Sequence, residues 1–173
     1  MVLTGIVYPV AVTALAQLLF PYQAGGSLLY DRSNLTGSVL IGQPFSDPKY
    51  FWSRPSATGD TPYNPLASGG SNLGPTNKVL IEQIANRTEQ LESSGIQAPV
   101  PSDLVEASAS GLDPDISVQS ALVQIPRVAK ARNLSEDIVR KLVLGHVEDR
   151  QFGFLGEQRI NVLKLNLALD SMK

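Results

Sequence analysis

The sequence predicts an α+β protein with a single N-terminal transmembrane helix and a compact mixed α/β domain of few short strands and three to four helices. Two observations carry this prediction. Residues 1–22 are mostly apolar, and the first charged side chain is Asp31. Helical patterns with capping residues are concentrated after residue 75. Twelve prolines and 14 glycines, most of them before residue 115, predict many turns and loops. We expect the helix over 1–22, a linker over 23–34 and the domain over 35–173.

The N-terminal segment has the length of one membrane span. A helix over residues 2–20 would extend nearly 30 Å at about 1.5 Å per residue. Pro9 removes one backbone hydrogen bond, which membrane helices tolerate where neighbouring helices cover the gap, and Pro21 marks the exit from the helix. A buried core helix and a cleaved signal peptide, with Ala14-Leu15-Ala16 as its small-residue site, are the alternatives. No basic residue precedes the apolar run, so the distribution of positive charge does not predict the orientation of this helix in the membrane.

Short strands and one long loop are expected in the domain. Apolar runs bounded by turn residues predict strands at 38–42, 104–107 and 160–163. Residues 43–75 contain six prolines and predict an irregular segment. Its aromatic residues argue against disorder, because such side chains can fix a loop onto a core.

Capping residues predict where the helices begin. Thr76 or Asn77 begins a helix that ends near residue 93, Ser117 begins a second and Ser135 a third. Pro126 is expected to kink or restart the second of these helices, because proline lacks the N–H and clashes with the preceding turn. A short closing helix is expected over 166–172.

Composition excludes several classes of function. Fourteen basic and 16 acidic residues leave a formal net charge of −2, without the basic excess of a nucleic-acid-binding protein. The chain has no cysteine and one histidine, His146, so no metal site is expected and a serine triad has little support. The simplest interpretation of the basic residues on the second and third helices is a solvated face; they are Arg127, Lys130, Arg132 and Arg140.

A glycine-rich stretch precedes the first predicted helix of the domain. Residues 69–76 have the spacing of a phosphate-binding loop, but Pro75 stands where the lysine belongs. The backbone N–H groups of such a loop can still hold an anion or a carboxylate. A structural turn, a partner-docking loop and a phosphate site all remain open.

Five motifs in the same order resemble one family. They are FWSRPS at 51–56, YNPLASGGSNLG at 63–74, ASASGLDP at 107–114, QIPRVAKAR at 124–132, and GFLG at 153–156 with NVLKLNLALD at 161–170. With them the chain resembles the C subunit of the Kdp potassium-transporting P-type ATPase, the KdpC family, from Leu3 to its C-terminus. Family members usually begin with a longer N-terminus that carries basic residues, so segment 1–22 is expected to be a shortened anchor.

The resemblance implies a place and partners. It implies a single-pass protein of the bacterial inner membrane, in contact with lipid, whose domain lies on the periplasmic, extracytoplasmic side. The partners would be a channel-like subunit that conducts K⁺ and a P-type ATPase subunit that hydrolyses ATP. The chain itself would be a non-catalytic accessory subunit of a high-affinity potassium uptake complex, without a tightly bound cofactor.

Two roles are compatible with the resemblance. In the first, the subunit assembles and stabilises the complex and modulates the pump through docking loops formed by Asn64, Ser71, Asn72, Ser110, Gly111, Leu112 and Asp113. In the second, it is a catalytic chaperone that raises the ATP affinity of the ATPase subunit by touching the nucleotide with Ser68, Gly69, Gly70, Gln124 and Arg127. ATP is cytoplasmic, so the orientation of the membrane segment decides between the two roles.

Overall fold

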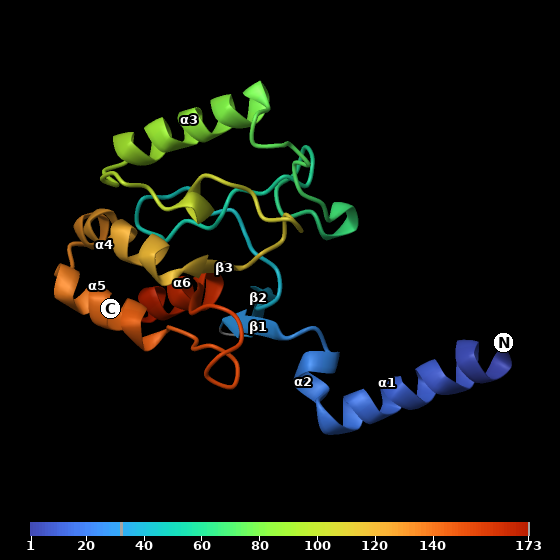
Figure 1. Ribbon diagram of the computed structural model, residues 1–173. Coiled ribbons are helices and arrows are strands. Elements are labelled where there is room, and N and C mark those ends of the chain that lie inside the picture. The colour runs from blue at the N-terminus through green and yellow to red at the C-terminus, as the bar shows by residue number, and fades with distance from the viewer. Residues whose placement is uncertain (32, 173) are drawn as a thin grey trace. The chain divides into compact units, whose positions relative to one another are not determined.

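A computed structural model describes residues 1–31 and 33–172 (Figure 1). The chain divides into two compact units, Met1–Leu40 and Ile41–Lys173, which we describe one at a time. Helices dominate both units and each contains one two-stranded antiparallel sheet, so the mixed α and β content predicted from the sequence is confirmed.

The first unit begins with three consecutive helical elements. A π-helical turn η1 (Leu3–Val7) leads into α1 (Tyr8–Leu19), and α2 (Pro21–Ala24) follows. Pro9 lies directly after the π-helical turn within this continuous helical stretch, and α2 begins at Pro21. Over the part of the chain that the structure describes, we find no helix with both the length and the apolar character needed to cross a membrane.

A β-hairpin completes the first unit. Strand β1 (Leu28–Asp31) pairs with β2 (Asn34–Ser38), with Leu28 opposite Ser38. The expectation of a strand over 38–42 is wrong, because β2 ends at Ser38. There the Ser38 hydroxyl donates to the Gly26 carbonyl at 2.7 Å and accepts from the Leu40 N–H at 3.1 Å, which turns the chain away. Strand β1 lies within the residues 23–34 that we treated as a linker.

The second unit is built on a small sheet packed against helices. Strand β3 (Asp115–Ser117) pairs with β4 (Arg159–Asn161), with Ile116 opposite Ile160. Helices α4 (Val118–Arg132), α5 (Glu136–Gly145) and α6 (Val162–Ser171) pack around it. The main core combines buried side chains of these elements; among them are Ile116, Ala121, Ile125, Val128, Val139, Val143, Ile160, Leu165 and Leu169.

Local caps begin the helices of this unit, as predicted. Helix α3 (Lys78–Ser93) follows Asn77, whose side-chain oxygen accepts from the Val79 N–H at 2.9 Å. The Ser117 and Ser135 hydroxyls cap α4 and α5 in the same way. Helix α4 continues through Pro126 as one element, so the prediction that the helix could restart there is wrong.

Two strand predictions in this unit need correction. Residues 104–107 are not a strand; a 3₁₀ turn, η3 (Ser102–Leu104), lies there instead. The strand expected over 160–163 ends at Asn161, because the Asn161 side-chain oxygen accepts from the Lys164 N–H at 3.1 Å and begins α6 at Val162. The closing helix therefore starts before residue 166.

The long segment 43–75 is irregular, apart from the short 3₁₀ helix η2 (Pro65–Ala67), and is fixed by its aromatic residues as expected. Phe51 is fully buried in the main core. The Asn166 side chain accepts from the Phe51 N–H at 2.9 Å and donates to the Phe51 carbonyl at 3.0 Å. One buried side-chain amide thus satisfies both backbone groups of Phe51, as a neighbouring strand would. This pairing holds the loop on α6.

Candidate functional site

The structure brings the two predicted docking loops together. The Gly69 N–H donates to the Ser110 carbonyl at 2.9 Å, and the Ser68 hydroxyl donates to the same carbonyl at 3.0 Å. Gly70 lies so close to Ala109 that a Cβ at position 70 would be 3.1 Å from the Ala109 carbonyl oxygen. Residues 68–70 and 108–111 therefore form one continuous surface.

Gly111 interlocks the two loops from the other side. Its φ is +67°, and a Cβ there would lie 2.5 Å from the Thr58 methyl carbon and 2.7 Å from the Gly69 carbonyl oxygen. The Ser56 hydroxyl donates to the Gly111 carbonyl at 2.7 Å, and the Gly111 N–H donates to the Ser108 hydroxyl at 3.0 Å. Only glycine combines this conformation with this spacing.

Tyr63 and Asn64 shape the turn that enters the first loop. Tyr63 has a φ of +58°, and its buried hydroxyl donates to the Arg54 carbonyl. Burial raises the pKa of Tyr63 to about 12. The Asn64 N–H donates to the Thr58 hydroxyl at 3.0 Å, and the Asn64 side-chain oxygen caps η2 by accepting from the Leu66 N–H at 3.0 Å. Asn64 is thus committed to the turn, while Ser71 and Asn72 lie exposed beyond it.

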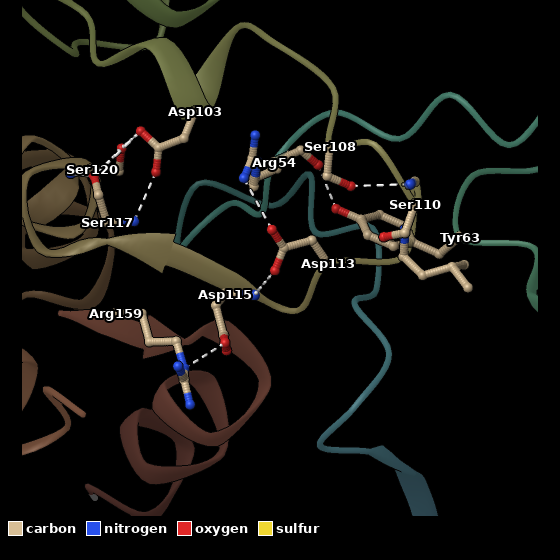
Figure 2. A network of polar contacts seen from close by, with 12 residues as sticks. Arg54, Tyr63, Asp103, Ser108, Ser110, Asp113, Asp115, Ser117, Ser120 and Arg159 are labelled. Atoms are coloured by element: carbon tan, nitrogen blue, oxygen red, sulfur yellow. Dashed lines mark hydrogen bonds and ion pairs between the residues drawn. The ribbon is translucent and has the colours of Figure 1, made fainter. Parts of the chain in front are cut away.

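Beside these loops, three carboxylates point to different partners (Figure 2). Asp113 pairs with Arg54 at 2.9 Å and Asp115 with Arg159 at 2.9 Å. Asp103 accepts from the Ser117 N–H at 2.7 Å and from the Ser120 hydroxyl, which anchors the start of α4.

These charged groups line a depression of about 470 Å³. Burial raises the pKa of Asp115, although the Asn161 amide and the Arg159 guanidinium oppose the shift. Among residues 1–31 and 33–172, no three His, Cys, Asp or Glu side chains are grouped to hold a metal ion. His146 packs locally, with its Nδ1 2.8 Å from the Leu142 carbonyl oxygen.

Arg127 is buried, so the interpretation of the α4 basic residues as a solvated face is wrong for it. Its side chain is 6% exposed and lies over the Trp52 ring, 4.0 Å from the ring centroid. It donates to the Pro48 carbonyl and to the Gln124 side-chain oxygen, both at 2.7 Å. Burial lowers the pKa of Arg127 to about 10. Lys130, on the same helix, stays exposed.

Gln124 completes this second cluster. Its side-chain oxygen accepts from the Trp52 N–H at 2.7 Å, and its amide donates to the carbonyls of Trp52 and Ser120 at 3.2 and 3.1 Å. The five nucleotide candidates thus fall into two groups with different contacts. Ser68, Gly69 and Gly70 contact loop 108–111, whereas Gln124 and Arg127 hold segment 48–52 on α4.

Sequence reasoning missed Arg54, Tyr63 and Asp103 as members of the polar framework. Arg54 and Tyr63 lie within the motifs that carry the family resemblance, so the motifs could have directed attention to them. Asp103 has no such signal, because its partners Ser117 and Ser120 are adjacent only in the fold.

Nearly the whole chain matches a known family. A family model described as "K+-transporting ATPase, c chain" matches residues 1–171. The chain belongs to the KdpC family. A protein of Geobacter metallireducens named "Potassium-transporting ATPase KdpC subunit" is 60% identical over 172 residues, which is 99% of this chain and 91% of that protein. Proteins of the same name from Geobacter sulfurreducens and Methylococcus capsulatus are 57% and 58% identical, with the same shares of both chains covered.

This membership confirms two predictions. The resemblance to the KdpC family is correct over nearly the full chain. As a KdpC chain, the protein is a subunit of a potassium-transporting ATPase complex and not a catalytic enzyme on its own. Other subunits of that complex are therefore its partners.

Proposed function

We propose that this KdpC chain is an accessory subunit that assembles and stabilises the channel-like and ATPase subunits through the joined loops 64–72 and 108–113. The interlock at Gly111 is the observation that carries the proposal. Loops held by backbone bonds and close glycine contacts lose little conformational freedom on binding, so more of the contact free energy appears as affinity.

The exposed edge of these loops has the composition of a docking surface. Leu66 is 94% exposed beside the polar, exposed Ser71 and Asn72. An apolar side chain surrounded by polar groups is the usual arrangement of a protein–protein contact. Asp113 and Arg54, already paired with each other, set the polar border.

A substitution at Gly69 tests the proposal. A Cβ at Gly69 would meet nothing closer than the Ala67 carbonyl oxygen at 4.0 Å, so a leucine there projects outward without disturbing the fold. We expect Gly69→Leu to reduce co-purification of the other subunits by about tenfold or more. Gly145→Leu is the matched control, because a Cβ there also meets nothing within 4 Å. Intact co-purification of Gly69→Leu, with unchanged transport, overturns this docking surface.

We further propose that the first unit is the membrane-associated part of the chain and that Ile41–Lys173 lies on the extracytoplasmic side. Within that unit no residue of α1 is buried, and its large apolar side chains require lipid or another subunit to cover them. Because the chain has no cysteine, Lys130→Cys, at an exposed position of α4 outside the docking loops, introduces a unique label site. We expect a membrane-impermeant maleimide to label it in intact cells; labelling only after lysis reverses the orientation.

The contacts of Gln124 and Arg127 favour docking over the second role, a catalytic chaperone that touches ATP. The Gln124 amide bonds to the Trp52 backbone, and the Arg127 guanidinium donates to the Pro48 carbonyl and to Gln124. We therefore expect titration of the full chain with millimolar ATP to give no saturable binding. Saturable binding that Arg127→Met abolishes, without loss of folding, would favour the chaperone role.

A further inference from the structure

An arm formed by residues 148–159 connects α5 to β4. Its two sides are joined by backbone bonds in both directions, between Glu148 and Arg159 at 2.8 and 3.1 Å, and between Gln151 and Leu155 at 2.9 Å each. Figure 1 shows this loop projecting from the helices of the second unit. The arm is therefore a loop closed by two isolated antiparallel bridges, one at its base and one next to its tip.

The stem of the arm comprises residues 148–150 and 157–159, and most of its charged side chains are paired with one another or with residues of β3 and α6. Lys164 binds Glu148 at 2.8 Å, and the Lys164 hydrogen bond lowers the pKa of that carboxyl. The remaining stem contacts run across the arm: Arg159–Glu148 at 3.2 Å, Gln158–Asp149 at 2.7 Å and Arg150–Glu157 at 2.7 Å. These contacts stabilise the stem, and the exposed residues at the tip are apolar.

The tip presents three apolar side chains to solvent. Phe152 is 86% exposed, Phe154 71% and Leu155 47%. Phe152 has a φ of +55°, a left-handed conformation that costs free energy for a residue with a Cβ. The turn is nevertheless closed by backbone bonds from Gly153 to Arg150 at 3.0 Å and from Phe154 to Gln151 at 3.3 Å. Within the described residues of Ile41–Lys173, neither phenylalanine belongs to a hydrophobic core cluster or packs against one.

We infer that the tip of the arm, Phe152, Phe154 and Leu155, inserts into an apolar pocket on another subunit of the same ATPase complex. Buried aromatic anchors on a preorganised turn are what interfaces use to concentrate binding free energy. The inference rests on the proposed accessory role and adds a second contact to it. The pocket should be lined by aliphatic or aromatic side chains and bordered by neutral or basic groups, since the stem is slightly acidic.

The charges of the arm favour a protein pocket over a lipid surface. Glu148, Asp149 and Glu157 stand against Arg150 and Arg159, three acidic groups against two basic ones. Loops that bind anionic lipid carry a surplus of Lys and Arg, which adds roughly 1 kcal/mol of attraction per residue. Here both arginines are already paired, and the surplus charge has the wrong sign.

Photocrosslinking tests which occupant covers the tip. A photoreactive benzoylphenylalanine replaces Phe154 in the full chain, and the assembled complex is irradiated in native membranes. We expect an adduct with another subunit, identified by mass spectrometry at apolar residues. Lipid adducts alone assign the tip to the bilayer and overturn the inference. Absence of any adduct, in a complex that has assembled, also overturns it.

A second set of variants measures the contribution of the tip. We expect Phe152→Ser with Phe154→Ser to weaken association with the other subunits about 30-fold or more, as for central aromatic anchors. The matched control is Val79→Ser with Ile81→Ser, which removes two half-exposed apolar side chains from α3. Equal co-purification of both double variants overturns the inference.

The same photoreactive residue at Asn72 separates the two proposals. Crosslinks from position 72 without crosslinks from position 154 refute the arm contact and leave the docking loops intact. Crosslinks from 154 alone refute the docking loops and support the arm. If neither position crosslinks and the chain does not co-purify with the complex, the accessory role itself is refuted.

Discussion

Replacing Arg127 with methionine tests whether this residue serves the fold. The change removes two hydrogen bonds from a charged donor, worth about 1.5–3 kcal/mol each, and a contact with the Trp52 ring worth about 1–2 kcal/mol. It also relieves a cost. Burial lowers the pKa of Arg127 from 12.5 to about 10, so charging the guanidinium in the folded protein costs about 3 kcal/mol.

The balance predicts a net loss of stability. Pro48 is exposed, so water can replace the lost donor at its carbonyl, and Gln124 keeps its bond to the Trp52 N–H. We therefore expect Arg127→Met to lower the free energy of unfolding by about 2–3 kcal/mol. Methionine fills much of the space of the arginine stem, which limits any cavity contribution.

Urea unfolding of the detergent-solubilised full chain measures this change. Trp52 is the only tryptophan, so its fluorescence reports on the Arg127 contact itself. We expect a lower unfolding midpoint and a red-shifted native emission for Arg127→Met. Arg140→Met, at an exposed position of α5, is the control and should leave both unchanged. If Arg127→Met unfolds like the wild type, the buried contacts do not stabilise the fold and the argument against nucleotide binding fails.

Three further predictions follow from buried or crowded groups. Gly111→Ala should cost at least about 2 kcal/mol by urea unfolding, because of its positive φ and the two close contacts, whereas Gly145→Ala should change stability by less than about 1 kcal/mol. Asn166→Ala should cost about 3 kcal/mol, since it leaves the buried backbone N–H and carbonyl of Phe51 without partners; a loss below about 1 kcal/mol would contradict this. Tyr63 has its folded pKa raised to about 12 from 10.0, so the unfolded chain releases this proton first and stability falls as the pH rises from 10 through about 12. The unfolding midpoint of Tyr63→Phe should therefore fall less than that of the wild type between about pH 9 and pH 11, and equal falls would refute the assignment.

The sequence predicted the helices of the second unit well because their signals are local. The side chains of Asn77, Ser117 and Ser135 cap N–H groups two or three residues further along the chain. Such bonds depend only on neighbours, so the sequence shows them directly. The same logic, had it been applied to Asn161, would have placed the start of α6 correctly.

The candidate site was only partly predictable. Sequence analysis indicated docking residues between 64 and 72 and at 110–113, and the structure joins these two loops. The resemblance could not show that Gly69 bonds to Ser110 or that Gly111 packs against Thr58, because those partners lie about 40 to 50 residues apart along the chain. Arg127 was predicted to be a surface residue because its partners Pro48 and Trp52 are also far from it along the chain.

By itself, the sequence determined the starts of α3, α4 and α5, the lack of cysteine, the apolar N-terminal segment and the membership of the KdpC family. Only the tertiary structure decided that β3 pairs with β4, that Gln124 and Arg127 hold segment 48–52, and that Phe152 and Phe154 lie exposed at the end of a braced arm. The physical reason is the range of the interactions. Caps and turns depend on neighbours within a few residues, whereas strand pairing, burial of a charge and exposure of an aromatic ring depend on which distant segments the fold brings together.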